Sequence, residues 1–316
     1  MHINNSLLTL LATCETATYL RWGQEVIWHE KQHPGAMEVG TVLHWALAHW
    51  LQGHNFQEIL AHFDQAWQGE VGGALPRQER LHPANVKLCL QYWMAQQPRR
   101  DVQVLTTEKT FEVPLGCIDG EEIIYYGTPD ALLEWKGDLY VLDHKSTGDI
   151  DEDWAAQWSM NSGLQGYVWG LRQRGYAVKG AFVNGIEIRR LPPWDGNLEK
   201  KCQTHKVKYK ECQPIHVKGQ WVGPLFWSDA RLEQWKRDAI AMVGKLQWLR
   251  DHDISKGLDY IKMDGQWRWP GCNGGRGRAP CQYRSFCQAG RPVAGITRMM
   301  IHQDWRRGEI REEEGA

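Results

Sequence analysis

The sequence predicts an α/β fold, because patterns typical of helices and of strands alternate along its 316 residues. Apolar residues recur with helical spacing between residues 38 and 51. Strand-forming residues instead fill two stretches on either side of a turn at 136–138, and the second of them runs from Leu139 to Leu142. An apolar content of 42% and a charged content of 24% fit a globular chain with a sizeable core.

Each element follows from its local pattern. Helices are expected at 4–28, at 38–51, near 56–69, near 83–97, at 149–174 and at 228–251. Strands are expected within 101–113, at 127–135, at 139–142 and at 176–188. Gly175 would end the helix between the last two strands. Residues 191–227 combine prolines, lysines and extended-looking segments, and the strongly charged residues 306–316 should fray.

Charged residues stand at the ends of the two strands around the 136–138 turn. They are Asp130, Asp143 and Lys145. Burying a carboxylate without a partner is costly, so a divalent metal ion held by the two acids would account for them. Lys145 would then lie beside a reacting phosphate. The alternative is an exposed hairpin that carries an ordinary salt bridge between Asp143 and Lys145.

This stretch resembles the PD-(D/E)xK nuclease superfamily, whose pattern is Gly-x-x-Asp followed by a strand that ends in Asp/Glu-x-Lys. Gly127, Asp130, Asp143 and Lys145 match it. The resemblance implies a restriction-endonuclease-like core, in which a central mixed sheet is flanked by helices. It also implies hydrolysis of phosphodiester bonds with Mg²⁺ or Mn²⁺.

Residues 40–44, Gly-Thr-Val-Leu-His, resemble a helix of the RecB-like branch of the same superfamily. The resemblance implies that His44 joins Asp130 and Asp143 on the metal, and that the carbonyl of His144 adds a ligand. Imidazole suits Mn²⁺, whereas Mg²⁺ prefers oxygen, so a histidine ligand would favour activity with Mn²⁺. The alternative is that His44 is a plain core or boundary residue.

The resemblance implies further catalytic residues. Lys145 would orient or help to deprotonate the attacking water and stabilise the transition state. RecB-like nucleases carry a glutamine and a tyrosine on the following helix, which here are Gln165 and Tyr167; their separation is shorter than in the family, whose glutamine position is occupied by Gly163. Glu108 matches an acid of the first strand and would lie behind the metal ligands, unless it is an exposed strand residue.

Cysteines form a second set of candidate ligands. Eight cysteines in an intracellular-looking chain favour metal or redox chemistry over a disulfide framework. Cys272, Cys281 and Cys287 lie in a Gly- and Arg-rich stretch. The resemblance to iron–sulfur members of the RecB-like nucleases implies that Cys14 is the fourth ligand of a [4Fe–4S] cluster. The alternatives are zinc on the same four cysteines, or scattered ordinary cysteines.

Five parts are therefore expected. They are an N-terminal helical part with Cys14 and His44 (1–100), a nuclease core (101–190), an insert and helix (191–267), a cysteine-rich iron–sulfur region that joins the N- and C-terminal parts (268–297), and a charged tail (298–316). A weaker set, Cys202, His205, Cys212 and His216, matches no compact zinc pattern.

Charge and hydropathy limit the partners. The formal net charge of −1 indicates that any DNA surface is a local basic patch. No apolar run is long enough to cross a membrane, and no signal peptide is recognisable, so a cytoplasmic protein is expected. The resemblance to RecB-like nucleases implies a bacterial or phage origin. The resemblance implies a metal-dependent DNA nuclease, an exonuclease acting on single strands or duplex ends, with a recombination, replication or CRISPR-adaptation partner. The alternative is a catalytically silent DNA-binding or adaptor protein of the same fold.

Overall fold

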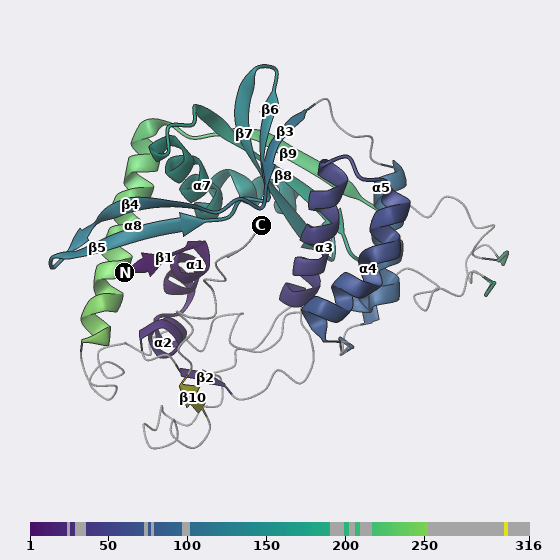
Figure 1. Cartoon of the computed structure of the whole chain (residues 1–316). Helices are drawn as coiled ribbons and strands as arrows, with labels where there is room; N and C mark the ends of the chain where they lie inside the picture. The colour runs from purple at the N-terminus through teal and green to yellow at the C-terminus, as the bar shows by residue number, and fades with distance from the viewer. Residues whose placement is uncertain are drawn as a thin grey trace. The chain divides into compact units, whose positions relative to one another are not determined.

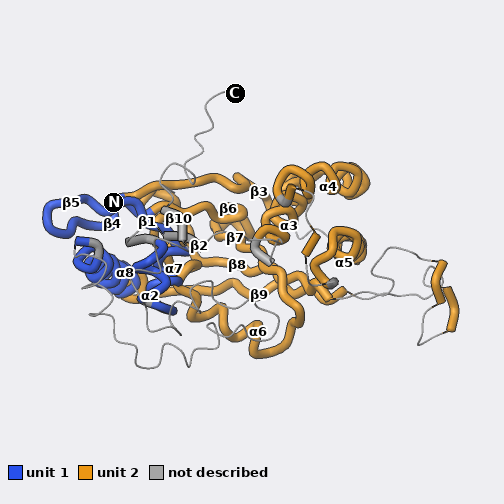
Figure 2. Tube along the Cα trace, turned by 90° about the horizontal axis from the view of Figure 1, so that it is seen from below, with its two compact units in different colours: residues 1–31, 114–125, 234–316 blue, residues 32–113, 126–233 orange. Residues whose placement is uncertain are grey.

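A computed structural model describes the chain in several segments, drawn as ribbon in Figure 1. They are residues 1–23, 26–28, 36–72, 75–76, 79–96, 102–189, 199–201, 206–208, 217–251 and 300–302. Two compact units share the chain (Figure 2). One comprises residues 1–31, 114–125 and 234–316, and the other comprises residues 32–113 and 126–233.

The second unit is built on a five-stranded sheet in the order β3-β6-β7-β8-β9. Its strands are β3 (Gln103–Thr107), β6 (Ala131–Trp135), β7 (Asp138–Thr147), β8 (Val178–Glu187) and β9 (Gly219–Phe226). The β7–β8 pair is parallel and the other pairs are antiparallel. The predicted mixed sheet flanked by helices is thus confirmed.

The hairpin of β6 and β7 follows from its turn. Lys136 and Gly137 both have positive φ angles, 55° and 82°. Two left-handed residues make the type of two-residue turn whose twist matches that of the flanking strands. The register pairs Trp135 with Asp138 and Ala131 with Leu142, so the turn brings the beginning of β6 close to the end of the apolar part of β7.

Three helices pack together in this unit: α3 (Ala36–Leu51), α4 (Phe56–Val71) and α5 (Pro83–Gln96). Their buried faces share one apolar core with Ile186 and Ile188 at the end of β8. These three helices lie close to their predicted positions, because each carries a strong apolar stripe.

The helix predicted at 149–174 is interrupted. It consists of α6 (Glu152–Ala156), the 3₁₀ helix η3 (Gln157–Met160) and α7 (Ser162–Gln173). Asn161 has extended backbone angles, and its side chain accepts a hydrogen bond from the N–H of Leu164. An asparagine that caps a new helix in this way ends the preceding one.

The first unit contains a three-stranded sheet in the order β1-β5-β4, and β2 pairs with β10. Its strands are β1 (His2–Ile3), β2 (Val26–Trp28), β4 (Phe111–Ile118), β5 (Glu121–Gly127) and β10 (Met300–His302). Residues 111–113 of β4 and 126–127 of β5 belong to the second unit. Its helices are α1 (Asn5–Thr13), α2 (Glu15–Thr18) and the π-helical turn η1 (Tyr19–Gly23); α8 (Asp229–Arg250) follows β9 near its predicted position.

The single helix predicted at 4–28 is therefore wrong. It breaks at Cys14, whose φ of −155° and ψ of 105° are extended, and β2 replaces its last residues. β10 was also not predicted, since it lies at the start of the expected charged tail. The set Cys202, His205, Cys212 and His216, which matches no compact zinc pattern, and residues 306–316 lie outside the described residues. None of the described helices is long and apolar enough to cross a bilayer.

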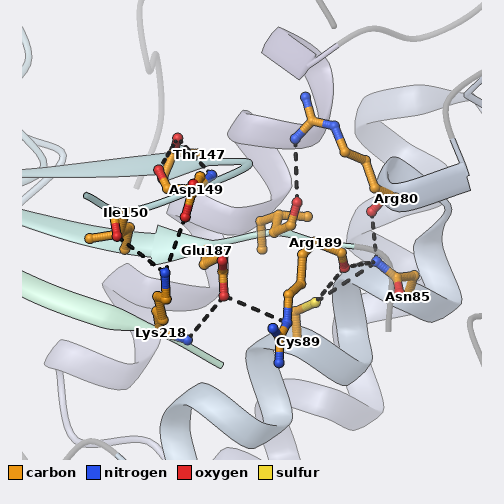
Figure 3. Close-up of polar contacts among 10 residues, drawn as sticks. Arg80, Asn85, Cys89, Thr147, Asp149, Ile150, Glu187, Arg189 and Lys218 are labelled. Carbon is orange, nitrogen blue, oxygen red and sulfur yellow. Dashed lines mark hydrogen bonds and ion pairs between the residues drawn. The ribbon is translucent and has the colours of Figure 1, made fainter. Parts of the chain in front are cut away.

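Beyond the carboxyl ends of β7 and β8, a polar network joins the sheet to α5 (Figure 3). The carboxylate of Glu187 accepts a hydrogen bond from the N–H of Lys218, 3.4 Å away, and lies 3.6 Å from Nε of Arg189. The carbonyl of Arg189 in turn accepts from the Asn85 amide at 2.9 Å and from the Cys89 thiol at 3.4 Å. These contacts satisfy buried polar groups where the strands end.

Candidate metal centre and active site

Asp130 lies directly before β6 and is almost fully buried. Its Oδ1 is 2.8 Å from Nδ1 of His44, and its Oδ2 accepts the backbone N–H of His144. Burial alone would raise the pKa of this carboxyl, but the hydrogen bond and charge of His44 hold it below the ordinary value. Asp130 is therefore a carboxylate at neutral pH, as a metal ligand must be.

His44 reaches this carboxylate from α3, which packs against β7. Burial would lower the pKa of its imidazole, but the hydrogen bond to Asp130 and the charge of that carboxylate raise the pKa overall. The fold thus brings the upstream histidine, predicted to share a metal ion with the two acids, into direct contact with Asp130. This contact joins residues 86 positions apart in the sequence.

Glu108 completes a compact group with these two residues. It follows β3 with a φ of 49°, and its N–H donates to the carbonyl of Asp130 at 3.1 Å. One ligand atom from each of His44, Glu108 and Asp130 lies within 4.8 Å of the others. Two carboxylates and an imidazole at this spacing fit a divalent cation. The resemblance implied that Glu108 lies behind the metal ligands, whereas its carboxylate lies among the candidate ligand atoms.

The electrostatics of Glu108 agree with this position. Loss of hydration raises the pKa of its carboxyl to about 7, and the like charge of Asp130 adds to the rise, although the residue as a whole is exposed. A cation placed among these carboxylates would stabilise the charged form of Glu108 and so lower its pKa.

Asp143 and Lys145 stand two residues apart on β7, so their side chains share one face of the sheet. Nζ of Lys145 lies 2.5 Å from Oδ2 of Asp143. The salt bridge of the alternative interpretation therefore exists, but its acid is buried rather than on an exposed hairpin. Asp143 is outside the compact group of His44, Glu108 and Asp130.

The pKa values of Asp143 and Lys145 are both raised, but for different reasons. Burial and the charge of Asp130 raise the pKa of Asp143 against the opposing effect of Lys145. Burial would favour the neutral amine of Lys145, but the charges of Asp143 and Asp130 raise its pKa. Lys145 is therefore an ammonium group, suited to stabilising negative charge.

His144 lies between the two acids in the chain, and its ring points to the opposite face of β7 from Asp143 and Lys145. The amide of Asn184 on β8, which pairs with His144 in register, lies 2.9 Å from Nδ1 of the ring. Burial lowers the pKa of His144 to about 4, so the imidazole is neutral. Asn184 was not predicted from the sequence, although it is a polar residue within an apolar strand.

Tyr167 and Gln165 lie on α7, in different surroundings. The Tyr167 ring packs on Gly127 and contacts Phe111 edge to face. Gln165 is buried; its amide donates to the carbonyls of Met160 and Asn161, and its oxygen accepts from Nε of Arg231 at 3.0 Å. The hydrogen bonds described for Gln165 thus serve the junction of α7 and α8, and none of them reaches Asp130 or Asp143.

Of the four predicted cluster ligands, Cys14 is described. It directly follows α1, and its Sγ accepts a hydrogen bond from the N–H of Ala17 at 3.4 Å. Cys272, Cys281 and Cys287 lie outside the described residues.

Comparison with known proteins gives one family match. The family model described as the PD-(D/E)XK nuclease superfamily matches residues 2–288. No curated protein matches the chain. Among solved structures, the chain is similar to one described as "Crystal structure of SSO0001", with 11% sequence identity and a TM-score of 0.29 over 75% of this chain and 84% of that chain.

Proposed function

Since the chain belongs to the PD-(D/E)XK nuclease superfamily, which suggests a metal-dependent nuclease, we propose that it is a RecB-like DNA exonuclease. One observation carries this proposal: Nδ1 of His44 lies 2.8 Å from Oδ1 of Asp130. An upstream histidine that meets the first acid of the motif is the feature by which the chain resembles the RecB-like branch.

The proposed ligands of the catalytic ion are His44, Glu108 and Asp130, with Asp143 and the carbonyl of His144 as further ligands. The donor set of carboxylates, imidazole and carbonyl suits Mg²⁺ or Mn²⁺. When bound, such an ion lowers the pKa of a coordinated water and offsets charge on the phosphate.

Lys145 acts in this proposal as a cation. Its N–H groups would orient the attacking water and donate to a non-bridging phosphate oxygen, where negative charge grows as the water oxygen bonds to phosphorus and the bond to the ester oxygen breaks. The attacking water would lose its proton to bulk water, and the leaving ester oxygen would take a proton from bulk water. The pKa of Lys145 is raised, which favours this role over that of a base. Tyr167 would contact the DNA backbone, and Gln165 would hold the start of α7 in position.

The four cysteines Cys14, Cys272, Cys281 and Cys287 are proposed to bind a [4Fe–4S] cluster. Two observations support this part of the proposal. Cys14 Sγ accepts a backbone hydrogen bond, a contact that tunes cluster sulfur. The pairing of β2 with β10 also joins the segment that follows Cys14 to the one that follows Cys287.

The proposed substrate is single-stranded DNA or a duplex with a free end. A bacterial or phage origin and a partner protein of recombination, replication or CRISPR adaptation belong to the same proposal. An exonuclease of this kind would release nucleotides progressively from one end of the strand.

The test is an anaerobic preparation assayed on DNA labelled at either end, with Mg²⁺, Mn²⁺ or EDTA. We expect degradation from one end with either ion, none with EDTA, and about four iron atoms per chain. Asp143→Ala and Lys145→Ala should abolish cleavage but keep the iron. An iron-free preparation with zinc on the cysteines contradicts the cluster, and undiminished cleavage by either variant contradicts the catalytic assignment.

A further inference from the structure

A groove between α3 and α4 gathers three histidines away from the candidate metal centre. It has a volume of about 640 Å³ and is lined by Trp45 and His49 of α3, His54 of the connecting loop, and Glu58 and His62 of α4. Trp45 directly follows His44, which contacts Asp130. Successive helical residues point about 100° apart, so α3 presents the two sites on different faces.

The rings of His49 and His54 are placed as a pair of ligands would be. Their centroids are 5.1 Å apart, with an angle of 50° between the ring planes. Two imidazoles that bind one tetrahedral Zn²⁺ at about 2.0–2.1 Å have centroids roughly 5 Å apart. The loop thus already brings these two rings to the separation that a shared ion requires.

The backbone fixes the tautomer of two of the histidines. Nδ1 of His49 lies 2.8 Å from the carbonyl of Trp45, and Nδ1 of His62 lies 2.9 Å from the carbonyl of Glu58. A carbonyl only accepts, so in the neutral imidazole each Nδ1 carries the proton and each Nε2 carries the lone pair. Metal-binding histidines commonly have their second nitrogen held in this way.

Glu58 adds an anionic donor to the three imidazoles. Glu58 and His62 are four residues apart on α4, so their side chains share one face of the helix. No three of the donor atoms in this groove all lie within 4.8 Å of one another, unlike the donor atoms of His44, Glu108 and Asp130. His54 and Glu58 are exposed, so rotation between staggered rotamers moves their donors at little cost while His49 and His62 keep their backbone contacts.

We propose that this groove binds a divalent late transition metal ion of the Zn²⁺ class through His49, His54 and His62, with Glu58 as the fourth ligand. Imidazole selects such ions over Mg²⁺, which prefers oxygen. The ion would link α3 to α4, and so support the helix that carries His44. The proposal stands independently of the nuclease activity.

The test is histidine footprinting of the full chain with diethyl pyrocarbonate, read residue by residue by mass spectrometry during a Zn²⁺ titration. We expect His49, His54 and His62 to become protected together, at one half-saturating concentration, whereas Mg²⁺ leaves them reactive. His49→Ala should raise the concentration that protects His54 and His62 at least tenfold. Because each histidine is read separately, zinc bound at His44 or at cysteines does not obscure the result.

His2→Ala is the matched control, since this exposed histidine lies on β1, outside the groove. It should leave the protection unchanged. If His49→Ala alters the circular dichroism spectrum, His49→Gln, which keeps the size and polarity of the side chain, replaces it. Protection of the three histidines at unrelated Zn²⁺ concentrations, or unchanged protection of His54 and His62 in the His49 variant, would overturn the proposal.

Discussion

The ring of Tyr167 lies so close to the backbone of Gly127 that no other residue type fits there without a shift. A Cβ atom on Gly127 would stand 2.8 Å from Cε1 of Tyr167 and 3.0 Å from Cζ of Phe111. The lack of a side chain at the glycine of the Gly-x-x-Asp pattern thus allows Tyr167 of α7 to pack against the segment that leads into Asp130. The role of Gly127 is close packing, because its φ angle is not in the left-handed region.

Gly127→Ala should therefore destabilise the protein by about 1–3 kcal/mol, the usual cost of overpacking. Unfolding in urea, followed by circular dichroism, measures the change. Gly40→Ala is the matched control, because a Cβ at Gly40 in α3 meets no atom within 4 Å. That substitution should stabilise the helix by roughly 0.5–1 kcal/mol. A Tyr167→Ala background should remove most of the Gly127→Ala penalty, and additive losses in the double variant would show that the close contact is not the cause.

His44→Ala should lower DNA cleavage at least ~100-fold, because it removes a proposed metal ligand and the hydrogen-bond partner of Asp130. The loss should be partly recovered at high Mn²⁺ if the ligand role is the larger one. His2→Ala, an exposed histidine on β1, is the control and should cleave DNA at the unaltered rate with Mg²⁺. Equal activity of the His44 variant and the unaltered protein at every Mn²⁺ concentration would exclude His44 as a ligand.

Metal affinity should depend on pH through Glu108, whose carboxyl pKa is raised to about 7. Below pH 7 the ion must displace a proton from this carboxyl, so Glu108 alone should lower the affinity up to tenfold per pH unit, in addition to the effect of the His44 imidazole, whose pKa is also raised. Above pH 7 the contribution of Glu108 should level off. Calorimetric titration with Mn²⁺ at pH 6, 7 and 8 measures this, and Glu108→Gln should weaken binding and reduce the slope below pH 7. An identical slope in the variant would assign the proton to another group.

The same raised pKa has an opposite effect on the metal-free fold. The folded state holds the Glu108 proton more tightly than the unfolded chain does, so this group favours folding most at low pH. Its contribution is lost as pH rises through about 7. Stability of the metal-free protein should thus fall slightly between pH 5 and pH 8 relative to Glu108→Gln, and urea unfolding at both values measures the difference.

The sequence predicted those elements whose signal is local. The apolar stripe of α3 and the turn at Lys136–Gly137 each determine their own element. The breaks at Cys14 and Asn161 depend on backbone angles that a continuous helical pattern conceals.

In the candidate site, too, the residues with a local sequence signal were predicted and the others were not. Asp130, Asp143 and Lys145 were predicted, because their spacing forms a motif. The position of Glu108 depends on its backbone hydrogen bond to Asp130, and that of Asn184 on the register between β7 and β8. Both are tertiary relationships, which no single stretch of sequence carries.

Asn85 offers a test of the network that joins α5 to the end of β8 (Figure 3). Its buried amide donates to the carbonyl of Arg80 at 2.7 Å and to that of Arg189 at 2.9 Å. Asn85→Ala removes both of these hydrogen bonds, although the Arg189 carbonyl still accepts from the Cys89 thiol, so we expect a loss of about 1–3 kcal/mol in urea unfolding.

Asn85→Asp separates the lost hydrogen bonds from the lost volume. It keeps the size of the side chain but turns an acceptor toward the same carbonyls, so it should destabilise the protein more than alanine does. Since Asn85 touches neither the acids nor Lys145 in the contacts described, both variants should cleave DNA normally at temperatures where they remain folded. An aspartate variant as stable as the unaltered protein would mean that the two amide hydrogen bonds contribute nothing to the joint between α5 and β8.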